Sequence, residues 1–298
     1  MVQRKRVIAL GFFDGVHMAH GALLSRVAEV AAALEAIPAA LTFDRLPKHR
    51  ADTLLLSTAA DRQWLMERYY GIREVEVLTF DRAMMEMPWQ QFVTGLLARD
   101  FNAIHVVAGH DFHFGYRGEG DPEKLRALCG ELGIGCDIIG RIELDGVTIS
   151  STHIRGLLQQ GEMEEACRYL GHPHILSGQV AHGKGLGRTL GFPTANLIPP
   201  AGVLVPAFGV YATRVVTEEG DSCLAVTNVG NRPTVDDGDK VTIEPWILDF
   251  DGDLYGRTIR VEFYKKLRGE RKFTSLEELR AEIFRNADQT RAYFAEKN

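Results

Sequence analysis

The chain has 298 residues, more than a single hydrophobic core usually holds, so its length predicts two domains. Its composition, 45% hydrophobic and 25% charged, is typical of a globular protein and excludes a disordered or fibrous one. The net charge of −6 gives no overall attraction to nucleic acid or to an anionic membrane. The most apolar early stretch, residues 27–43, contains two glutamates and a proline and is too short to span a bilayer.

The first six residues lead directly into a strand-like run rather than into the apolar core of a signal peptide, so we expect a cytoplasmic protein. The four cysteines show no spacing typical of a zinc site and are predicted to be buried thiols in a reducing compartment. They are Cys129, Cys136, Cys167 and Cys223.

Up to residue 172, short β-rich runs alternate with longer helical runs, a pattern typical of a parallel sheet covered by helices. Expected strands cover residues 7–10, 39–43, 74–80, 103–109 and 136–140, and expected helices cover 20–35, 59–70, 89–99, 122–132, 152–159 and 163–170. Gly171 is a helix stop signal and Pro173 follows it. We therefore predict a Rossmann-like α/β domain over residues 1–172.

From residue 173 the pattern changes to short β-rich runs separated by Gly, Pro, Asn and Asp. Expected strands cover residues 174–181, 209–216, 222–229, 241–250 and 258–264, and an amphipathic helix is expected over 275–294. Close spacing of short strands predicts a small antiparallel β-barrel over residues 173–298, with the last helix packed against it.

Two histidines stand where the first expected strand gives way to a helix, in the segment GFFDGVHMAH of residues 11–20. Carboxyl ends of parallel strands and helix N-termini are places where anionic ligands bind. His17 and His20 share one face of the first turn and can both donate to one phosphate, while Gly15 relieves the turn and Asp14 braces it. The alternative is a pair of solvated capping residues; a zinc site lacks a third ligand.

Three segments in this order resemble the adenylyl-transferring nucleotidyltransferases: residues 11–20, GHDFHFG at 109–115 and ISSTHIR at 149–155. In the third segment, Ser151 or Thr152 is expected to cap a helix and Arg155 to reach a phosphate from its first turn. The resemblance implies that His17, His20 and Arg155 act in adenylyl transfer. It implies nucleotide contacts for Gly11, Phe13, Asp14, Gly15, Ser151 and Thr152, and a flavin contact for Asp111.

A glycine-rich loop, GQVAHGKGLGRTLGFPTANL, occupies residues 178–197. It is not a Walker motif, because Gly185 follows Lys184 where a magnesium-binding Ser or Thr is required. It is not a dinucleotide fingerprint either, because Pro193 and β-rich sequence follow it. With both motifs excluded, the segment is interpreted as a basic loop that leads to Thr194 and Asn196. The neutral side-chain oxygens of these two residues are ligands that Mg²⁺ accepts.

The order GKGLGR then GFPTAN closely resembles the signature of riboflavin kinase. The resemblance continues through PAFGVYAT, NVGNRPTV, IEPWILDFDGDLYG and LRGERKF, at residues 206–213, 228–235, 243–256 and 267–273. With the N-terminal motifs, the whole chain resembles the bacterial bifunctional riboflavin kinase/FMN adenylyltransferase family, also called FAD synthetases. The resemblance implies that Thr194 and Asn196 hold Mg²⁺ and ATP and that Glu244 accepts the proton of the riboflavin 5′-hydroxyl. It also implies nucleotide contacts for Gly183, Lys184, Gly187 and Arg188, and flavin contacts for Tyr211 and Arg268.

The family resemblance implies two reactions. Riboflavin and ATP give FMN in the barrel, and FMN and a second ATP give FAD and pyrophosphate in the α/β domain. The expected partners are therefore small molecules, with no nucleic acid and no membrane, and the oligomeric state is open. Departures from the family pattern at Phe12, Ala19, Arg45 and Leu46 all lie in the first domain. They leave open the alternative of a riboflavin kinase whose first domain no longer transfers adenylyl groups. A second alternative, a non-catalytic flavin-binding protein, is disfavoured by the presence of Thr194, Asn196 and Glu244.

Overall fold

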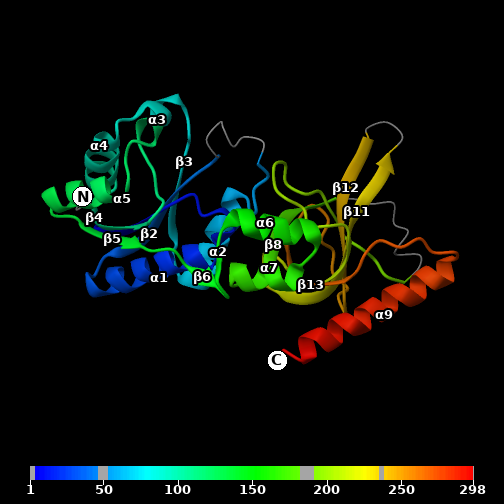
Figure 1. Cartoon of the computed structure of the whole chain (residues 1–298). Helices are drawn as coiled ribbons and strands as arrows, with labels where there is room; N and C mark the ends of the chain where they lie inside the picture. Colours follow the sequence, from blue (N-terminus) through cyan, green and yellow to red (C-terminus); the bar gives the residue numbers. More distant parts are fainter. Residues whose placement is uncertain (1–3, 46–52, 182–190, 235–237, 298) are drawn as a thin grey trace. The chain divides into compact units, whose positions relative to one another are not determined.

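The computed structural model describes residues 4–45, 53–181, 191–234 and 238–297, and the chain divides into two compact units (Figure 1). Unit 1 comprises Met1–Thr53 and Thr58–Ser150, and unit 2 comprises Leu54–Ser57 and Ser151–Asn298. Each unit has its own sheet, so the two-part fold expected from the sequence is confirmed.

Unit 1 contains a five-stranded sheet in the order β3-β2-β1-β4-β5, and all four neighbouring pairs are parallel. The strands are β1 (Arg6–Leu10), β2 (Ile37–Phe43), β3 (Glu74–Leu78), β4 (Ala103–Gly109) and β5 (Gly135–Ile139). Sheet residues such as Ile8, Leu41 and Val106 pack with Phe92, Leu97 and Leu125 in one buried cluster. This burial fixes the sheet and so holds the loops at the carboxyl ends of its strands.

The main helices of unit 1 are α1 (Met18–Ala33), α2 (Ala59–Tyr70) and α5 (Pro122–Glu131), with a short α3 (Arg82–Glu86). The helix expected over 89–99 begins as α4 (Trp89–Gln91) but continues as a π-helix, η3 (Phe92–Asp100). The 3₁₀ turns η1 (Asp14–Val16) and η4 (Tyr116–Gly118) and the hairpin β6 (Glu143–Leu144) with β7 (Val147–Thr148) complete the unit. The sequence did not predict α3 or this hairpin, because such short elements show no clear periodicity.

Unit 2 begins with α6 (Ser151–Gln160) and α7 (Met163–Leu170) and forms a closed antiparallel barrel in the order β10-β11-β12-β9-β8-β13. The strands are β8 (His174–Ala181), β9 (Asn196–Leu197), β10 (Gly209–Val216), β11 (Ser222–Thr234), β12 (Gly238–Ile247) and β13 (Thr258–Arg268). Alternate residues, among them Tyr211, Val229, Ile243 and Phe263, are fully buried. The last helix, α9 (Leu276–Ala295), packs on β10 and β11, as expected (Figure 1).

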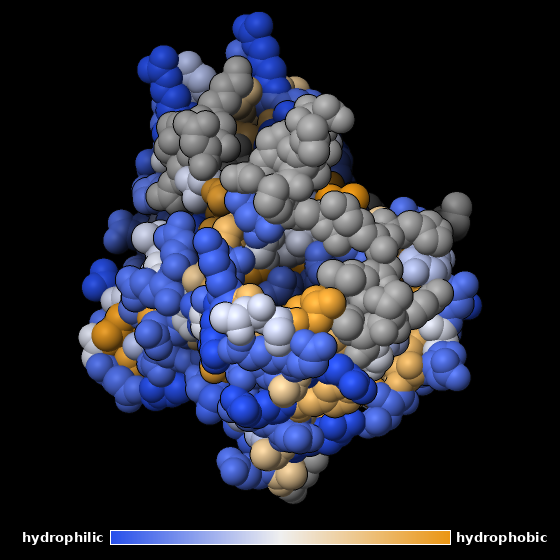
Figure 2. All heavy atoms as spheres, turned by 90° about the vertical axis from the view of Figure 1, so that its right-hand side faces the viewer, coloured by the Kyte–Doolittle hydropathy of each residue, from blue (hydrophilic) through white to orange (hydrophobic). Residues whose placement is uncertain are grey.

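Among the residues that the structure describes, no helix is long and apolar enough to cross a bilayer. The face of the molecule drawn in Figure 2 is mostly hydrophilic, with small apolar patches. All four cysteines are free thiols, and only Cys129 is fully buried; the other three are half-buried, which corrects the expectation that all are buried.

His174, at the start of β8, is 2% exposed, and its Nε2 has no hydrogen-bond partner among the residues that the structure describes. Burial, and then the neighbouring His172, lower the pKa of His174 to about 3. In the unfolded chain this ring takes up a proton near pH 6.5, whereas in the folded chain it stays neutral until the pH approaches its lowered pKa. We therefore expect the barrel to lose stability as the pH falls from about 7, by up to about 1.4 kcal/mol per pH unit below 6.

His174→Asn tests this prediction, because the amide takes the place of the ring Nδ1 but does not titrate. Hydrogen exchange of the β8 and β13 amides at pH 7, 6 and 5 should show a shallower loss of protection in His174→Asn than in the natural chain. Equal losses in both proteins would assign the acid sensitivity to other groups.

Candidate functional site

The first predicted site lies at the carboxyl edge of the unit 1 sheet. The strand order is β3-β2-β1-β4-β5. From β1 the chain continues to β2 and β3 on one side, and from β4 it continues to β5 on the other side. The strand order therefore reverses between β1 and β4, and this is the topological switch point of the sheet. Gly11 follows β1, and Asp111 follows β4 with its side chain exposed. The two predicted ligand-binding loops therefore flank the position at which open α/β sheets bind ligands.

The loop after β1 has an unusual backbone. Phe13 and Val16 have positive φ values of 57° and 44°, and Gly15 between them has φ 76°. A positive φ is rare for any residue with a side chain and most unfavourable for a β-branched one, and such strain concentrates at functional sites. Phe13 and Val16 are fully buried and Asp14 is 3% exposed, so packing holds the loop in this form.

This loop ends on the histidine pair. His17 is the N-cap of α1, and its Nδ1 accepts a long hydrogen bond of 3.4 Å from the backbone N–H of His20. The two rings stack, with centroids 3.6 Å apart and planes 11° apart. Because Nδ1 of His17 is an acceptor, its proton lies on Nε2, the nitrogen that can donate to a ligand. His17 can therefore cap α1 through Nδ1 and still bind a ligand together with His20, so the two predicted roles are compatible.

The environment of His20 favours the neutral form of its ring. Burial lowers its pKa well below the usual value, and the nearby His17 and Arg62 lower it further. Its Nδ1 is buried and has no hydrogen-bond partner among the described residues. A buried ring nitrogen without a hydrogen-bond partner destabilises the folded protein, and a ligand that binds the ring would offset this cost. The histidine pair is therefore suited to binding an anion.

The residues that depart from the family pattern are also placed. Ala19 lies in the first turn of α1 with a negative φ, so a methyl group there adds no backbone strain. Arg45 is exposed and pairs with Asp44, 3.3 Å from Nη2 to Oδ2. Leu46 lies outside the described residues.

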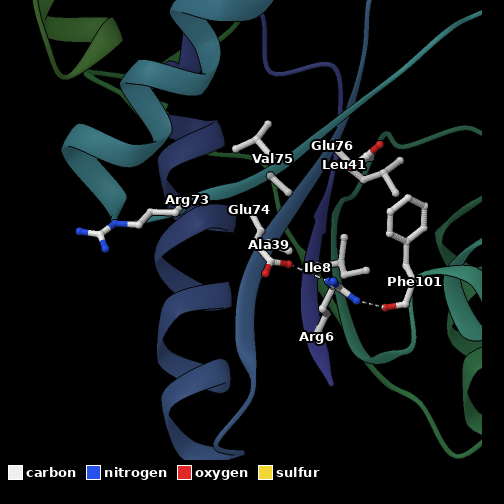
Figure 3. Close-up of a pocket in the computed structure, with 10 residues that line it drawn as sticks. Arg6, Ile8, Ala39, Leu41, Arg73, Glu74, Val75, Glu76 and Phe101 are labelled. Carbon is white, nitrogen blue, oxygen red and sulfur yellow. Dashed lines mark hydrogen bonds and ion pairs between the residues drawn. The ribbon is translucent and has the colours of Figure 1, made fainter. Parts of the chain in front are cut away.

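A cavity of about 340 Å³ in unit 1 lies away from these histidines (Figure 3). It is lined by Arg6 and Glu74, the first residues of β1 and β3, and is therefore at the amino ends of these strands. Arg6 donates to Glu74 at 2.8 Å and to the carbonyl of Phe101 at 3.1 Å. Arg73, which also lines the cavity, pairs with Glu67 outside it. None of the predicted site residues line this cavity.

Ser151, Thr152 and Arg155 belong to unit 2, whereas the histidines belong to unit 1. Helix α6 begins at Ser151, so Ser150 rather than Ser151 or Thr152 precedes it, which corrects the predicted cap. The Nε of Arg155 donates to the carbonyl of Leu54 at 2.7 Å and anchors the segment that pairs with Val203. The roles of these three residues in adenylyl transfer remain predictions.

The second predicted site is built on the barrel. Thr194 bridges Trp246, Ala195 N–H donates to the carbonyl of Pro245 at 2.9 Å, and Leu197 pairs with Ile243. In this antiparallel register Asn196 falls directly opposite Glu244, where side chains are about 5 Å apart at Cβ and share one face. Thr194, two residues earlier, shares the face of Asn196. The structure therefore brings together the three residues predicted for the kinase site.

The next strand extends this row. Asn228 of β11 pairs with Glu244 of β12 and is exposed, so an amide, a carboxylate and a second amide follow one another across β9, β12 and β11. Thr242 donates to Oε1 of Glu244 at 3.2 Å and so orients the carboxylate. The row lies on the outer face, because the alternate residues Ile243 and Val229 fill the barrel. Sequence reasoning did not identify Asn228, although it noted the segment that contains it.

The segment LRGERKF lies next to this row. A Cβ built on Gly230 would lie 2.7 Å from Oε1 of Glu270 and 3.5 Å from Nδ2 of Asn228, so the carboxylate of Glu270 lies against the backbone of β11 beside Asn228. Arg268 donates to Oδ1 of Asn286 at 3.1 Å and lies 3.7 Å from Glu282, both on α9. Arg268 thus ties the segment to α9, and the flavin contact predicted for it stays a prediction.

Tyr211 is a core residue. It is fully buried, its hydroxyl donates to the carbonyl of Ala207, and burial raises its pKa. Its ring packs edge-on against Phe263, with centroids 5.4 Å apart. The predicted flavin contact is inconsistent with this placement, because the side chain has no exposed surface. Gly183, Lys184, Gly187 and Arg188 lie outside the described residues.

The residues present at this site fit a magnesium ion. Oδ1 of Asn196 is buried and has no hydrogen-bond partner in the described structure. A neutral amide oxygen of this kind is a ligand that Mg²⁺ accepts beside phosphate and water oxygens. No cluster of three His, Cys, Asp or Glu side chains that could hold a metal ion occurs among the described residues.

Comparison with known proteins identifies both units. The FAD synthetase family model matches residues 1–153, and the riboflavin kinase family model matches residues 170–294. The chain is therefore an α/β domain of the FAD synthetase class joined to a flavokinase barrel.

Similar proteins resemble it over nearly the whole chain. A bifunctional riboflavin kinase/FMN adenylyltransferase from Listeria monocytogenes is 35% identical over 97% of this chain and 93% of that protein. One from Pseudomonas fluorescens is 37% identical over 95% of this chain and 90% of that protein. The chain belongs to the bifunctional riboflavin kinase/FMN adenylyltransferase family.

A solved structure described as a macrolide-efflux protein from Streptococcus pneumoniae has the same fold. It is 30% identical, with a TM-score of 0.83, and covers 98% of this chain and 95% of that one.

Proposed function

We propose that the barrel phosphorylates riboflavin to FMN with ATP, and that the α/β domain joins FMN to the adenylyl group of a second ATP, giving FAD and pyrophosphate. Mg²⁺ serves both steps, and the reactions take place in the cytoplasm. Along the chain, we place the boundary between the two domains near residues 172 and 173, although α6 and α7 belong to the same compact unit as the barrel. The observation that carries the proposal is the register that places Asn196 opposite Glu244. The four free thiols support a reducing compartment.

In the kinase step, Glu244 accepts the proton from the riboflavin 5′-hydroxyl. Its carboxylate is oriented by Thr242 and lies between Asn196 and Asn228. Phosphoryl transfer needs an oriented acceptor for the hydroxyl proton and groups that position the phosphates. Mg²⁺ bound at Thr194 and Asn196 would neutralise phosphate charge.

In the adenylyl-transfer step, the histidine pair binds the phosphates of ATP. His17 presents its Nε2 proton from the N-cap of α1, where the first backbone N–H groups of the helix also favour an anion. Burial, His17 and Arg62 lower the pKa of His20 and so favour its neutral ring. We assign to this ring the stabilisation of the negative charge that develops as pyrophosphate leaves.

The proposal is tested by separating the products of the purified chain incubated with riboflavin, ATP and magnesium. We expect FMN to appear first and FAD to follow, and chelation of magnesium to stop both reactions. FMN without FAD would establish the kinase-only alternative. Neither product would overturn the assignment of both sites and favour a non-catalytic flavin-binding protein.

A further inference from the structure

Arg62 of α2 is an unusual buried cation beside the histidine site. Its side chain is fully buried, and its Nη2 donates a hydrogen bond of 2.7 Å to the carbonyl of Phe43. Nε and Nη1 are buried without hydrogen-bond partners in the described structure. Removing a guanidinium from water while leaving two of its nitrogens unsatisfied destabilises the fold, so this arrangement calls for a functional reason.

The guanidinium lies over the ring of Phe12, 4.5 Å from its centroid. Phe12 follows β1 by two residues, and its carbonyl accepts a hydrogen bond of 2.8 Å from Oγ1 of Thr42 on β2. Phe43, the other partner of Arg62, is the last residue of β2. One side chain from α2 therefore contacts the carboxyl ends of both strands, at the start of the strained loop that carries the histidines.

We propose that Arg62 is a positioning residue for adenylyl transfer, which stacks on Phe12 and so holds the loop of residues 11–17 in the form that presents His17 and His20 to the nucleotide. The inference rests on the proposed role of the histidine pair. It explains why a phenylalanine stands at position 12, where the family pattern has a small or polar residue. A planar guanidinium stacks on an aromatic face in a way that a lysine ammonium does not reproduce.

The charge of Arg62 also acts on His20. Three sets of groups surround His20: the stacked ring of His17, the edge-on ring of Phe13 with centroids 5.2 Å apart, and the positive charge of Arg62. The pKa of His20 is lowered by burial, by His17 and by Arg62. Asp14, Asp44 and Asp61 favour the charged form of Arg62, while burial lowers its pKa. Loss of the guanidinium charge should therefore raise the pH at which His20 takes up a proton.

The stack is tested with Phe12→Leu, Arg62→Lys and the double variant. Each single change should lower kcat/KM for FAD formation from FMN about tenfold, within the range that a desolvated cation–π contact supports. The double variant should lose little more than either single one, because both remove the same contact. FMN formation by the barrel of the same molecules is the internal control and should be unchanged.

A third variant, Arg62→Met, removes the charge. The acidic limb of the pH profile of FAD formation should move to higher pH in Arg62→Met and stay in place in Phe12→Leu, whose guanidinium is intact. A purely structural role would lower the melting temperature of Arg62→Met without moving its acidic limb, and this result would overturn the proposal. Phe12→Leu removes the aromatic ring but keeps an apolar side chain of similar size. It therefore tests the contact between Arg62 and Phe12 even if Arg62→Met does not fold.

The outcomes separate this inference from the proposed function. Absence of FAD from the natural chain would overturn adenylyl transfer itself. FAD formation by the natural chain and by Phe12→Leu and Arg62→Lys at equal rates would overturn only the role of Arg62.

Discussion

Glu244→Gln is expected to lower FMN formation from riboflavin about a thousandfold, within the range measured for loss of a general base. Glutamine has the size of glutamate and can still accept the hydrogen bond from Thr242, which is 3.2 Å long in the natural protein. It cannot take up the proton of the 5′-hydroxyl. The loss should fall on kcat rather than on the KM for riboflavin, because the acceptor is needed only as the proton moves.

Two controls make this expectation specific. FAD formation from supplied FMN should be unchanged in Glu244→Gln, because that reaction is assigned to the other unit. Thr242→Val removes only the group that orients the carboxylate and should cost about tenfold or less. FMN formation by Glu244→Gln at more than about a tenth of the natural rate would contradict the assignment of Glu244 as the base.

Much of the fold could be predicted because it depends on periodicity within single elements. Helix α2, strand β4 and strand β10 begin and end at the predicted residues. Strand β11 was expected to stop at residue 229 but continues to Thr234, because the Asn, Arg and Pro residues that indicate a turn lie within the long β11–β12 ladder.

The site on the barrel could be predicted only in part. A sequence shows which residue types are present, but it does not show the register in which two strands pair. Thr194, Asn196 and Glu244 were identified by their motifs, but their meeting depends on β9, a strand of two residues that closes the barrel. Asn228 belongs to the site through its pairing with Glu244, a relation that no spacing along the chain encodes.

Arg62 illustrates a second limit. A charged residue in an amphipathic helix is normally expected on the solvated face. No sequence pattern indicates that this arginine is fully buried, because its partners, Phe12 and the carbonyl of Phe43, lie at the ends of two strands far from it along the chain. Tyr211 shows the converse, since a residue expected at the ligand fills the core.

The histidine pair carries the second large effect, and its two members require different substitutions. His17 is both a proposed phosphate ligand and the N-cap of α1, so His17→Ala would also remove a cap worth about 1 kcal/mol. Asparagine is among the preferred N-cap residues, and His17→Asn therefore removes the Nε2 donor while preserving the start of the helix. His20→Gln removes the second ring and leaves the cap intact.

Each of these changes is expected to lower FAD formation from FMN by about a hundredfold or more, as loss of one preorganised donor to developing charge does. The double variant should lose less than the product of the two, because the rings stack and respond to the same phosphate charge. FMN formation should stay at the natural rate, so riboflavin supplied with ATP would accumulate as FMN. If His17→Asn and His20→Gln both make FAD at the natural rate, the pair is a helix cap alone and the adenylyl-transfer site must be sought elsewhere in unit 1.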